Sequence, residues 1–177
     1  IGLVAVSPML FYDIILNKEL ETDYSKSYIL ETSWAVNTIN NLAGFAGLVD
    51  VGLRYSFYSE DGQEKTGVKA LSRLLPYFMS GLSLLSGLVF AVFWFFPLSP
   101  DLRKYWLLLL VIFLYLPFIF FVSSREKLAY FGQVPLKTRL SLLLASTAEW
   151  GTALGSFVSV AYLMGLHVPL YNLIPLY

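Results

Sequence analysis

The sequence is poor in charge, cysteine and histidine. Only 14% of its 177 residues are charged and 57% are hydrophobic, whereas a soluble domain carries about 25% charged residues. A soluble fold of this size has too little interior to bury so many apolar side chains. Acidic and basic residues balance at twelve each, which removes the basic footprint of a nucleic-acid-binding protein. Without cysteine there is no disulfide framework or thiolate chemistry, and the single His167 does not build a zinc site alone.

Long runs with little or no charge are what the sequence has instead. A helix that crosses a bilayer needs about 20 apolar residues, because only a helix satisfies its own backbone in hydrocarbon. Four ranges predict such helices: 1–16, 74–97, 105–124 and 140–166. Pro117 lies inside the third and predicts a kink. The chain starts at Ile1 rather than Met and ends in an unfinished apolar run. We therefore expect an all-α, multi-pass membrane protein that is a fragment of a longer chain.

The stretch 28–58 is apolar on average but unsuited to a lipid-facing helix. It contains these polar residues and glycines: Glu31, Asn37, Asn40, Asn41, Gly44, Gly47, Asp50, Gly52 and Arg54. Buried polar groups need partners, and broken backbone at membrane depth is tolerated only within protein or beside a watery cavity. The stretch therefore predicts a broken or re-entrant helical element. Re-entry puts most basic residues on one side, as the positive-inside rule requires, with 17–27, 56–73 and 125–139 in the cytoplasm and 98–104 outside.

Glu149 is the most informative single residue. It lies nine residues into its predicted helix, about 14 Å along the axis, near the middle of a hydrocarbon core about 30 Å thick. A charge there costs roughly 2.5–3.5 kcal/mol and marks a candidate functional site. The structural alternative is an ion pair or a protonated, hydrogen-bonded carboxyl.

Arg54 and Asp13 are further candidates. The Arg54 guanidinium suits a phosphate, which it can hold with two hydrogen bonds, but a pair with Asp50 one helical turn earlier is an equally good interpretation. Asp13 lies near the end of the first apolar run, and its residues alone favour an interfacial carboxylate.

Backbone amides of the broken element are candidate anion ligands, as at the exposed N-termini of half-helices in transporters. Supporting positions are Asn40, Asn41, Gly44, Gly47, Asp50 and Gly52. No pattern resembles a nucleophile–base–acid triad, a paired-carboxylate hydrolytic site or a metal cluster. We therefore assign no catalytic residue, metal or other cofactor.

Three segments together resemble a known family. FYDIIL, NTINNLAGFAGLVDVGLRYSFY and STAEWGTALGSF resemble, in order and spacing, the membrane region of the bacterial lysylphosphatidylglycerol synthase and flippase, the multiple peptide resistance factor family. The resemblance covers essentially the whole chain. It implies that Asp13, Arg54 and Glu149 are flippase-site positions, which raises Asp13 above the interfacial interpretation.

The resemblance also implies a function and partners. Family members join a flippase region to a cytosolic domain that moves lysine from lysyl-tRNA onto phosphatidylglycerol. The membrane region is expected to move the product to the outer leaflet of the bacterial cell membrane, where it repels cationic antimicrobial peptides. Expected partners are anionic and aminoacylated phospholipids, the remaining helices and synthase domain of the parent chain, and a second copy of the chain. The synthase domain is absent here, so we do not expect this chain to be an enzyme itself.

Other functions remain open from the sequence. The broken helix also suits a small-solute or ion transporter. A membrane anchor or scaffold for the synthase domain would tolerate neutral substitution of Glu149 and Arg54, provided that helix packing survives.

Overall fold

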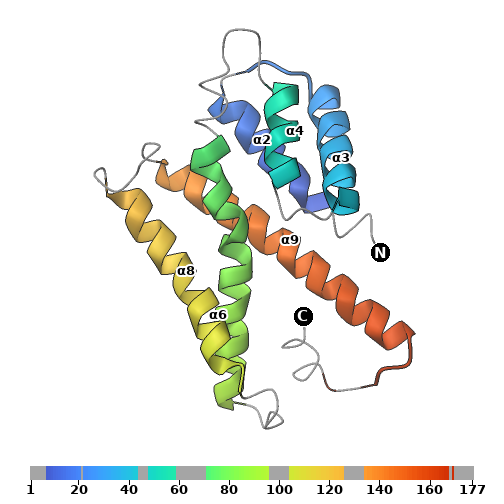
Figure 1. Cartoon of the computed structure of the whole chain (residues 1–177), viewed down its shortest axis with the longest axis vertical. Coiled ribbons are helices and arrows are strands. Elements are labelled where there is room, and N and C mark those ends of the chain that lie inside the picture. Colours follow the sequence, from blue (N-terminus) through green and yellow to red (C-terminus); the bar gives the residue numbers. More distant parts are fainter. Residues whose placement is uncertain are drawn as a thin grey trace.

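The computed structural model describes residues 7–20, 22–43, 48–58, 71–95, 104–125, 134–167 and 169. Its elements are helical throughout this part of the chain, which confirms the predicted all-α class (Figure 1). In chain order they are η1 (Ser7–Met9), α2 (Leu10–Glu19), α3 (Lys26–Ala43), α4 (Leu48–Tyr58), η2 (Leu75–Met79), α6 (Ser80–Phe95), α8 (Trp106–Ser124) and α9 (Leu136–Leu163).

The helices form two groups. The first group is α6 packed against both α8 and α9, and the second is α3 packed against α4 and α2. Figure 1 shows α6 and α8 at one end of the molecule and α2, α3 and α4 at the other, with α9 running obliquely between these two sets of helices. Because α2 contacts both α3 and α9, it is the helix that connects the two groups.

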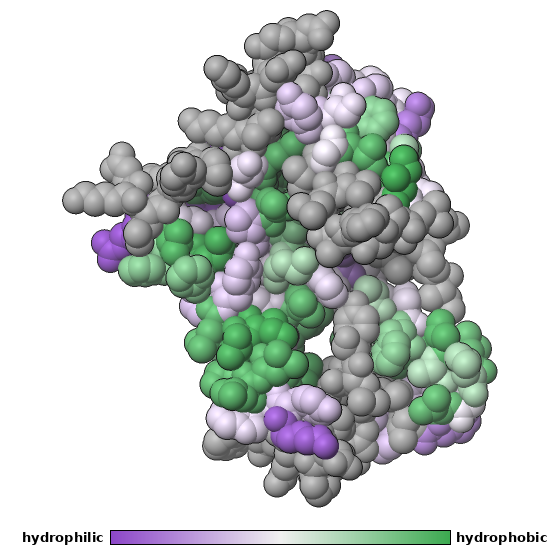
Figure 2. Space-filling model, viewed as in Figure 1, coloured by the Kyte–Doolittle hydropathy of each residue, from purple (hydrophilic) through white to green (hydrophobic). Residues whose placement is uncertain are grey.

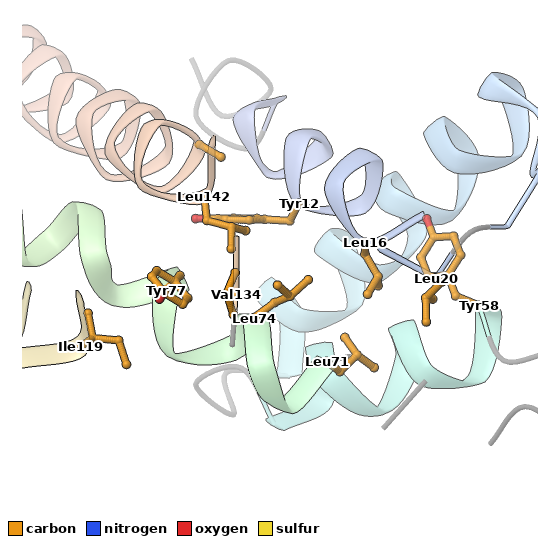
Figure 3. Close-up of a cluster of buried hydrophobic side chains, with 11 residues drawn as sticks. Tyr12, Leu16, Leu20, Tyr58, Leu71, Leu74, Tyr77, Ile119, Val134 and Leu142 are labelled. Atoms are coloured by element: carbon orange, nitrogen blue, oxygen red, sulfur yellow. The ribbon is translucent and has the colours of Figure 1, made fainter. Parts of the chain in front are cut away.

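A buried apolar cluster lies where the groups meet. Leu16 and Leu20 of α2 pack in it with Tyr58 of α4 and Leu142 of α9, and the segment around Leu74 lies among them (Figure 3). Burying a side chain of this size contributes about 1.5–3 kcal/mol. The cluster therefore fixes the register of α2 against its neighbours.

Pro117, where the sequence predicts a kink, lies within the continuous helix α8, and a neighbouring helix bonds the backbone beside it. Proline lacks the N–H that would bond the carbonyl of Phe113. The Ser83 hydroxyl of α6 donates towards the carbonyls of Ile112 and Phe113, at 2.7 and 2.9 Å, and accepts the N–H of Leu116 at 2.9 Å. One inserted side chain thus satisfies backbone groups around the interruption in α8.

The contact between α6 and α9 depends on Gly81. A Cβ atom at this position would collide with the backbone of Ser146. The Gly81 N–H donates to the Ser146 hydroxyl at 2.8 Å, and that hydroxyl donates to the carbonyl of Phe78 at 2.7 Å. Small residues allow such close approach between helices in membranes.

The stretch 28–58 forms a helical hairpin in its described part. The hydroxyl of Tyr28, near the start of α3, donates to the carbonyl of Phe57, near the end of α4, at 2.9 Å. The rings of Tyr24 and Tyr28 stack with centroids 4.8 Å apart, beside Tyr58. The chain therefore returns to the level from which it started, with residues 44–47 between the two helices.

Two helices are long and apolar enough to cross a membrane among the described residues, Leu71–Val92 and Trp106–Ser124. They coincide with the predicted ranges 74–97 and 105–124. Only 11% of the second stretch is buried, and large residues such as Leu107 and Phe118 are more than half exposed. Figure 2 shows the resulting apolar surface, with strongly hydrophilic residues at its margins. A core helix of a soluble protein would be mostly buried, so these helices are suited to a lipid environment.

A polar layer joins four segments at one end of the helices. Glu19 of α2 accepts hydrogen bonds from Arg73 at 2.9 Å and from Thr138 at 3.0 Å. Arg139, beside Thr138 in the first turns of α9, donates to the Ser124 hydroxyl of α8 at 2.7 Å. The ends of α2 and α8, the start of α9 and the segment before η2 therefore lie at one level.

Candidate functional site

A buried ion pair connects α2 to α4. Arg54 Nε donates to Asp13 Oδ1 at 2.8 Å, and Arg54 Nη2 donates to Asp13 Oδ2 at 3.0 Å. Both side chains are 0% exposed. This two-bonded geometry is the strongest arrangement for an arginine and a carboxylate. The pair therefore ties α4 firmly to α2.

Asn37 of α3 extends the pair into a network. Its Oδ1 accepts a hydrogen bond from Arg54 Nη2 at 3.2 Å, and its Nδ2 donates to the Ser33 hydroxyl at 3.2 Å. Asn37 and Ser33 stand four residues apart, on one face of α3. Because both are buried, the network orients the guanidinium from a third helix.

Glu149 lies on the other side of α2. The hydroxyl of Tyr12 donates to Glu149 Oε2 at 2.6 Å, across 137 positions of sequence. Tyr12 is buried, whereas Glu149 is partly accessible. Tyr12 and Asp13 are consecutive, so α2 presents one partner to α9 and the next to α4.

Phe78 of η2 lies between the two contacts. Its ring centroid is 4.2 Å from that of Tyr12, and the guanidinium carbon of Arg54 lies 5.9 Å from the same ring, within the range of a cation–π contact. Its carbonyl accepts hydrogen bonds from Ser146 at 2.7 Å and Trp150 at 3.3 Å. One residue thus links the Asp13–Arg54 pair to the helix that carries Glu149.

The three predicted site residues are therefore brought into one connected cluster. We define the polar cluster as Tyr12, Asp13, Asn37, Arg54 and Glu149. Asp13, which sequence reasoning alone placed at an interface, is instead wholly enclosed by protein and paired with arginine.

Of the supporting positions, Gly52 is exposed, with no other group near its Cβ direction. The side chains of Asn40, Asn41 and Asp50, and the glycines 44 and 47, lie outside the described residues, so an Arg54–Asp50 contact stays untested.

Sequence reasoning missed Tyr12 as a site residue and did not select Asn37. Tyr12 carries no signal beyond its place beside Asp13 in FYDIIL. Asn37 belongs to the polar set that marked 28–58 as unusual, and its spacing of four from Ser33 was the available signal.

The cluster combines charges of both signs with hydrogen-bonding groups. Taken as ionised, its two carboxylates and one guanidinium give a formal charge of −1. Within the described residues, no three His, Asp or Glu side chains gather closely enough to hold a metal ion. The arrangement is suited to binding a ligand that carries both a negative and a positive group.

Comparison with known proteins identifies relatives. A phosphatidylglycerol lysyltransferase of Bacillus subtilis (strain 168) is 32% identical over 175 residues, and one of Staphylococcus aureus (strain MRSA252) is 31% identical over 176 residues. Each alignment covers 94% of this chain but 20% of the relative, so the chain spans about one fifth of the length of the relatives it matches. No family model and no solved structure matches.

Two membrane-capable helices and these relatives together indicate that the chain is associated with a membrane. The alignments cover the part of the sequence that contains the polar cluster, and not only one short motif. They agree with the family that the three sequence segments resemble. This chain is therefore related, over nearly its whole length, to one region of the phosphatidylglycerol lysyltransferase family that its sequence resembles.

Proposed function

We propose that this chain forms part of a path that carries aminoacylated phosphatidylglycerol, such as lysylphosphatidylglycerol, from the inner to the outer leaflet of the bacterial cell membrane. The observation that carries the proposal is the polar cluster. In it, consecutive residues of α2 bond two charged side chains, since Asp13 pairs with Arg54 and Tyr12 donates to Glu149. The relatives are named for phosphatidylglycerol, which supplies the class of lipid.

Charge matching supports this ligand. The headgroup of lysylphosphatidylglycerol carries one phosphate and two ammonium groups, and therefore a formal charge of +1. The cluster offers one guanidinium and two carboxylates. Arg54 is suited to the phosphate, because guanidinium and phosphate geometries match, while Asp13 and Glu149 are suited to the two ammonium groups.

The closed state of the ion pair is compatible with transport if the partners exchange. A buried charge left without a partner costs about 3–5 kcal/mol. The Asp13–Arg54 pair therefore separates only if each side chain gains another charged partner. A headgroup with both signs of charge gives Arg54 a phosphate and Asp13 an ammonium at the same time. The exchange keeps every charge compensated, and a ligand of only one sign cannot do this.

The membrane topology follows the polar layer and the hairpin. The bonds among Glu19, Arg73 and Thr138 support a common side for the described parts of 17–27, 56–73 and 125–139, which we assign to the cytoplasm. Residues 21, 59–70 and 126–133 lie outside the described residues. The Tyr28–Phe57 contact favours re-entry of 28–58 from that same side. Lys104 stands before the opposite end of α8, whose 19 residues span about 28 Å at 1.5 Å per residue, and we assign it to the outside.

The consequence for the cell is a change in surface charge. Cationic lipid in the outer leaflet reduces the negative surface potential that attracts basic peptides, which would protect against cationic antimicrobial peptides. Synthesis of the lipid belongs, in this proposal, to the remainder of the parent protein.

The test is translocation in proteoliposomes that contain the protein and lysylphosphatidylglycerol in one leaflet. A membrane-impermeant amine reagent measures its appearance in the other leaflet. We expect Glu149→Gln and Arg54→Ala to slow this several-fold. The matched controls Glu31→Gln and Arg125→Ala, at exposed positions, should not. Equal rates in all variants, or no translocation by the unsubstituted protein, contradict the proposal.

The same vesicles separate the competing functions. Accumulation of soluble amino acids or ions, with no preference among lipids, favours a solute transporter. Normal lipid exposure in folded Glu149→Gln and Arg54→Ala variants favours an anchor or scaffold.

A further inference from the structure

An apolar groove lies between α2 and α9, on the outside of the polar cluster. It has a volume of about 430 Å³ and is lined by Phe11, Ile14 and Ile15 of α2 and by Leu144, Ala145 and Ala148 of α9. Ser141 adds one hydroxyl. The volume falls within the range of about 300–1,000 Å³ that is usual for small-ligand sites.

The two helices that line the groove also carry Tyr12, Asp13 and Glu149 of the polar cluster. Tyr12 and Asp13 stand between Phe11 and Ile14 in the sequence, and Glu149 directly follows Ala148. Residues three or four positions apart are neighbours on a helix surface. Tyr12 stands three residues before Ile15, and Glu149 stands four residues after Ala145, so the Tyr12–Glu149 hydrogen bond lies beside lining residues of both helices.

We infer that this groove binds one acyl chain of the phospholipid whose headgroup enters the polar cluster. The inference rests on the proposed function, which it deepens by locating the lipid tail.

Three observations favour an acyl chain over a soluble ligand. Apart from Ser141 the lining side chains are apolar, and large ones such as Phe11 and Leu144 are 53% and 71% exposed on the rim, which suits hydrocarbon rather than water. The floor contains Ala145 and Ala148, whose small side chains admit a thin chain close to the helix. Continuity with a charged cluster fits a molecule that is apolar at one end and charged at the other.

The inference is tested by photocrosslinking in vesicles. Two phospholipids carry the same diazirine in one acyl chain, one with a lysylphosphatidylglycerol headgroup and one with phosphatidylcholine. Mass spectrometry then locates the crosslinks. We expect labelling of 11–15 and 141–148 several-fold above that of the exposed face of α8, and stronger labelling with the lysyl headgroup. Labelling spread evenly over the lipid-facing surface overturns the inference.

Variants separate the groove from the headgroup site. Ala148→Phe fills the groove and should reduce labelling by both lipids several-fold, whereas Ser159→Phe, at an exposed position of α9 outside the lining, should not. Phe11→Ala removes one exposed wall without threatening the fold, and should also reduce labelling. Glu149→Gln should abolish the preference between headgroups while phosphatidylcholine still labels. Circular dichroism verifies that each variant keeps its helices.

The outcomes distinguish the two proposals. If Ala148→Phe and Phe11→Ala leave the labelling unchanged while translocation still requires Glu149, the groove inference is wrong and the proposed function stands. If labelling behaves as expected but Glu149→Gln translocates lipid normally, the proposed function fails. If neither lipid labels the groove while both label the exposed face of α8, the groove is closed to lipid, which also overturns the inference.

Discussion

Removing one partner of the Asp13–Arg54 pair should lower the free energy of unfolding more than removing both partners. The two charge-assisted bonds measure 2.8 and 3.0 Å, and neither side chain is exposed. Arg54→Met leaves a buried carboxylate without its counter-charge, and Asp13→Asn leaves a buried guanidinium. Each change should lower the free energy of unfolding by about 3–5 kcal/mol.

The double variant should regain most of that loss. A buried ion pair that is replaced on both sides by apolar groups of similar volume is often as stable as the original, because two desolvated charges disappear together. We expect Asp13→Leu with Arg54→Met to come within about 1 kcal/mol of the unsubstituted protein, and the single variant Asp13→Leu to lose about as much as Asp13→Asn. Unfolding by SDS in mixed micelles, followed by circular dichroism, measures all four forms of the cycle.

Two results would refute this reasoning. Single variants that lose less than about 1 kcal/mol would show a pair that water already compensates. A double variant as unstable as the single variants would show that the two residues do not act through each other.

The double variant also tests the proposed function. A folded double variant that still translocates lipid at the normal rate would make the pair purely structural, and would remove the main support for transport.

Three further substitutions test other contacts. Tyr12→Phe keeps the aromatic stack but loses its bond to the carboxylate of α9, and should cost about 1.5–3 kcal/mol in the same micelle titration and slow translocation. Ser83→Ala leaves backbone groups unsatisfied beside Pro117 in α8, so unfolding should become easier by about 1–3 kcal/mol. An equal effect of Ser159→Ala, whose hydroxyl bonds its own helix, would contradict this. Gly81→Ala forces α6 from α9 and should destabilise, whereas Gly151→Ala has open space and should be neutral or stabilising by up to about 1 kcal/mol.

Helix positions were largely predictable from the apolar runs, and the errors lie at charged boundaries. The candidate span predicted from residue 74 includes Leu71–Arg73 within its helix, and Glu19 neutralises Arg73 there. Likewise α9 begins at Leu136, four residues before the predicted start, and includes Lys137. In an isolated helix, a charged residue indicates where the helix leaves the hydrocarbon. When that residue pairs with a side chain of another helix, the helix can continue past it.

The partners of the site residues were not predictable. Rare charges in apolar sequence identified Arg54 and Glu149 as candidates, because that signal is local, whereas the family resemblance raised Asp13 above an interfacial interpretation. The ion pair joins residues 41 positions apart, and the Tyr12 bond joins residues 137 apart. Such contacts depend on how helices pack, which one sequence does not encode as a spacing. The interruption of backbone bonding at Pro117 was predictable for the same local reason, while the Ser83 hydroxyl that bonds beside it was not.

The order of charges along α2 and α9 suggests how a headgroup meets the cluster. Glu19 belongs to the polar layer, and Asp13 lies six residues deeper, about 9 Å along α2. On α9, Thr138 bonds Glu19, and Glu149 lies eleven residues further, about 16 Å along the axis. The Tyr12–Glu149 hydrogen bond brings these two positions together, because Tyr12 is the neighbour of Asp13 on α2. Under the proposed function, a headgroup that enters beside the polar layer would therefore meet the Asp13–Arg54 pair and Glu149 at nearly the same level. On this arrangement we expect Arg54→Ala and Glu149→Gln to slow translocation alike, which the proteoliposome assay measures.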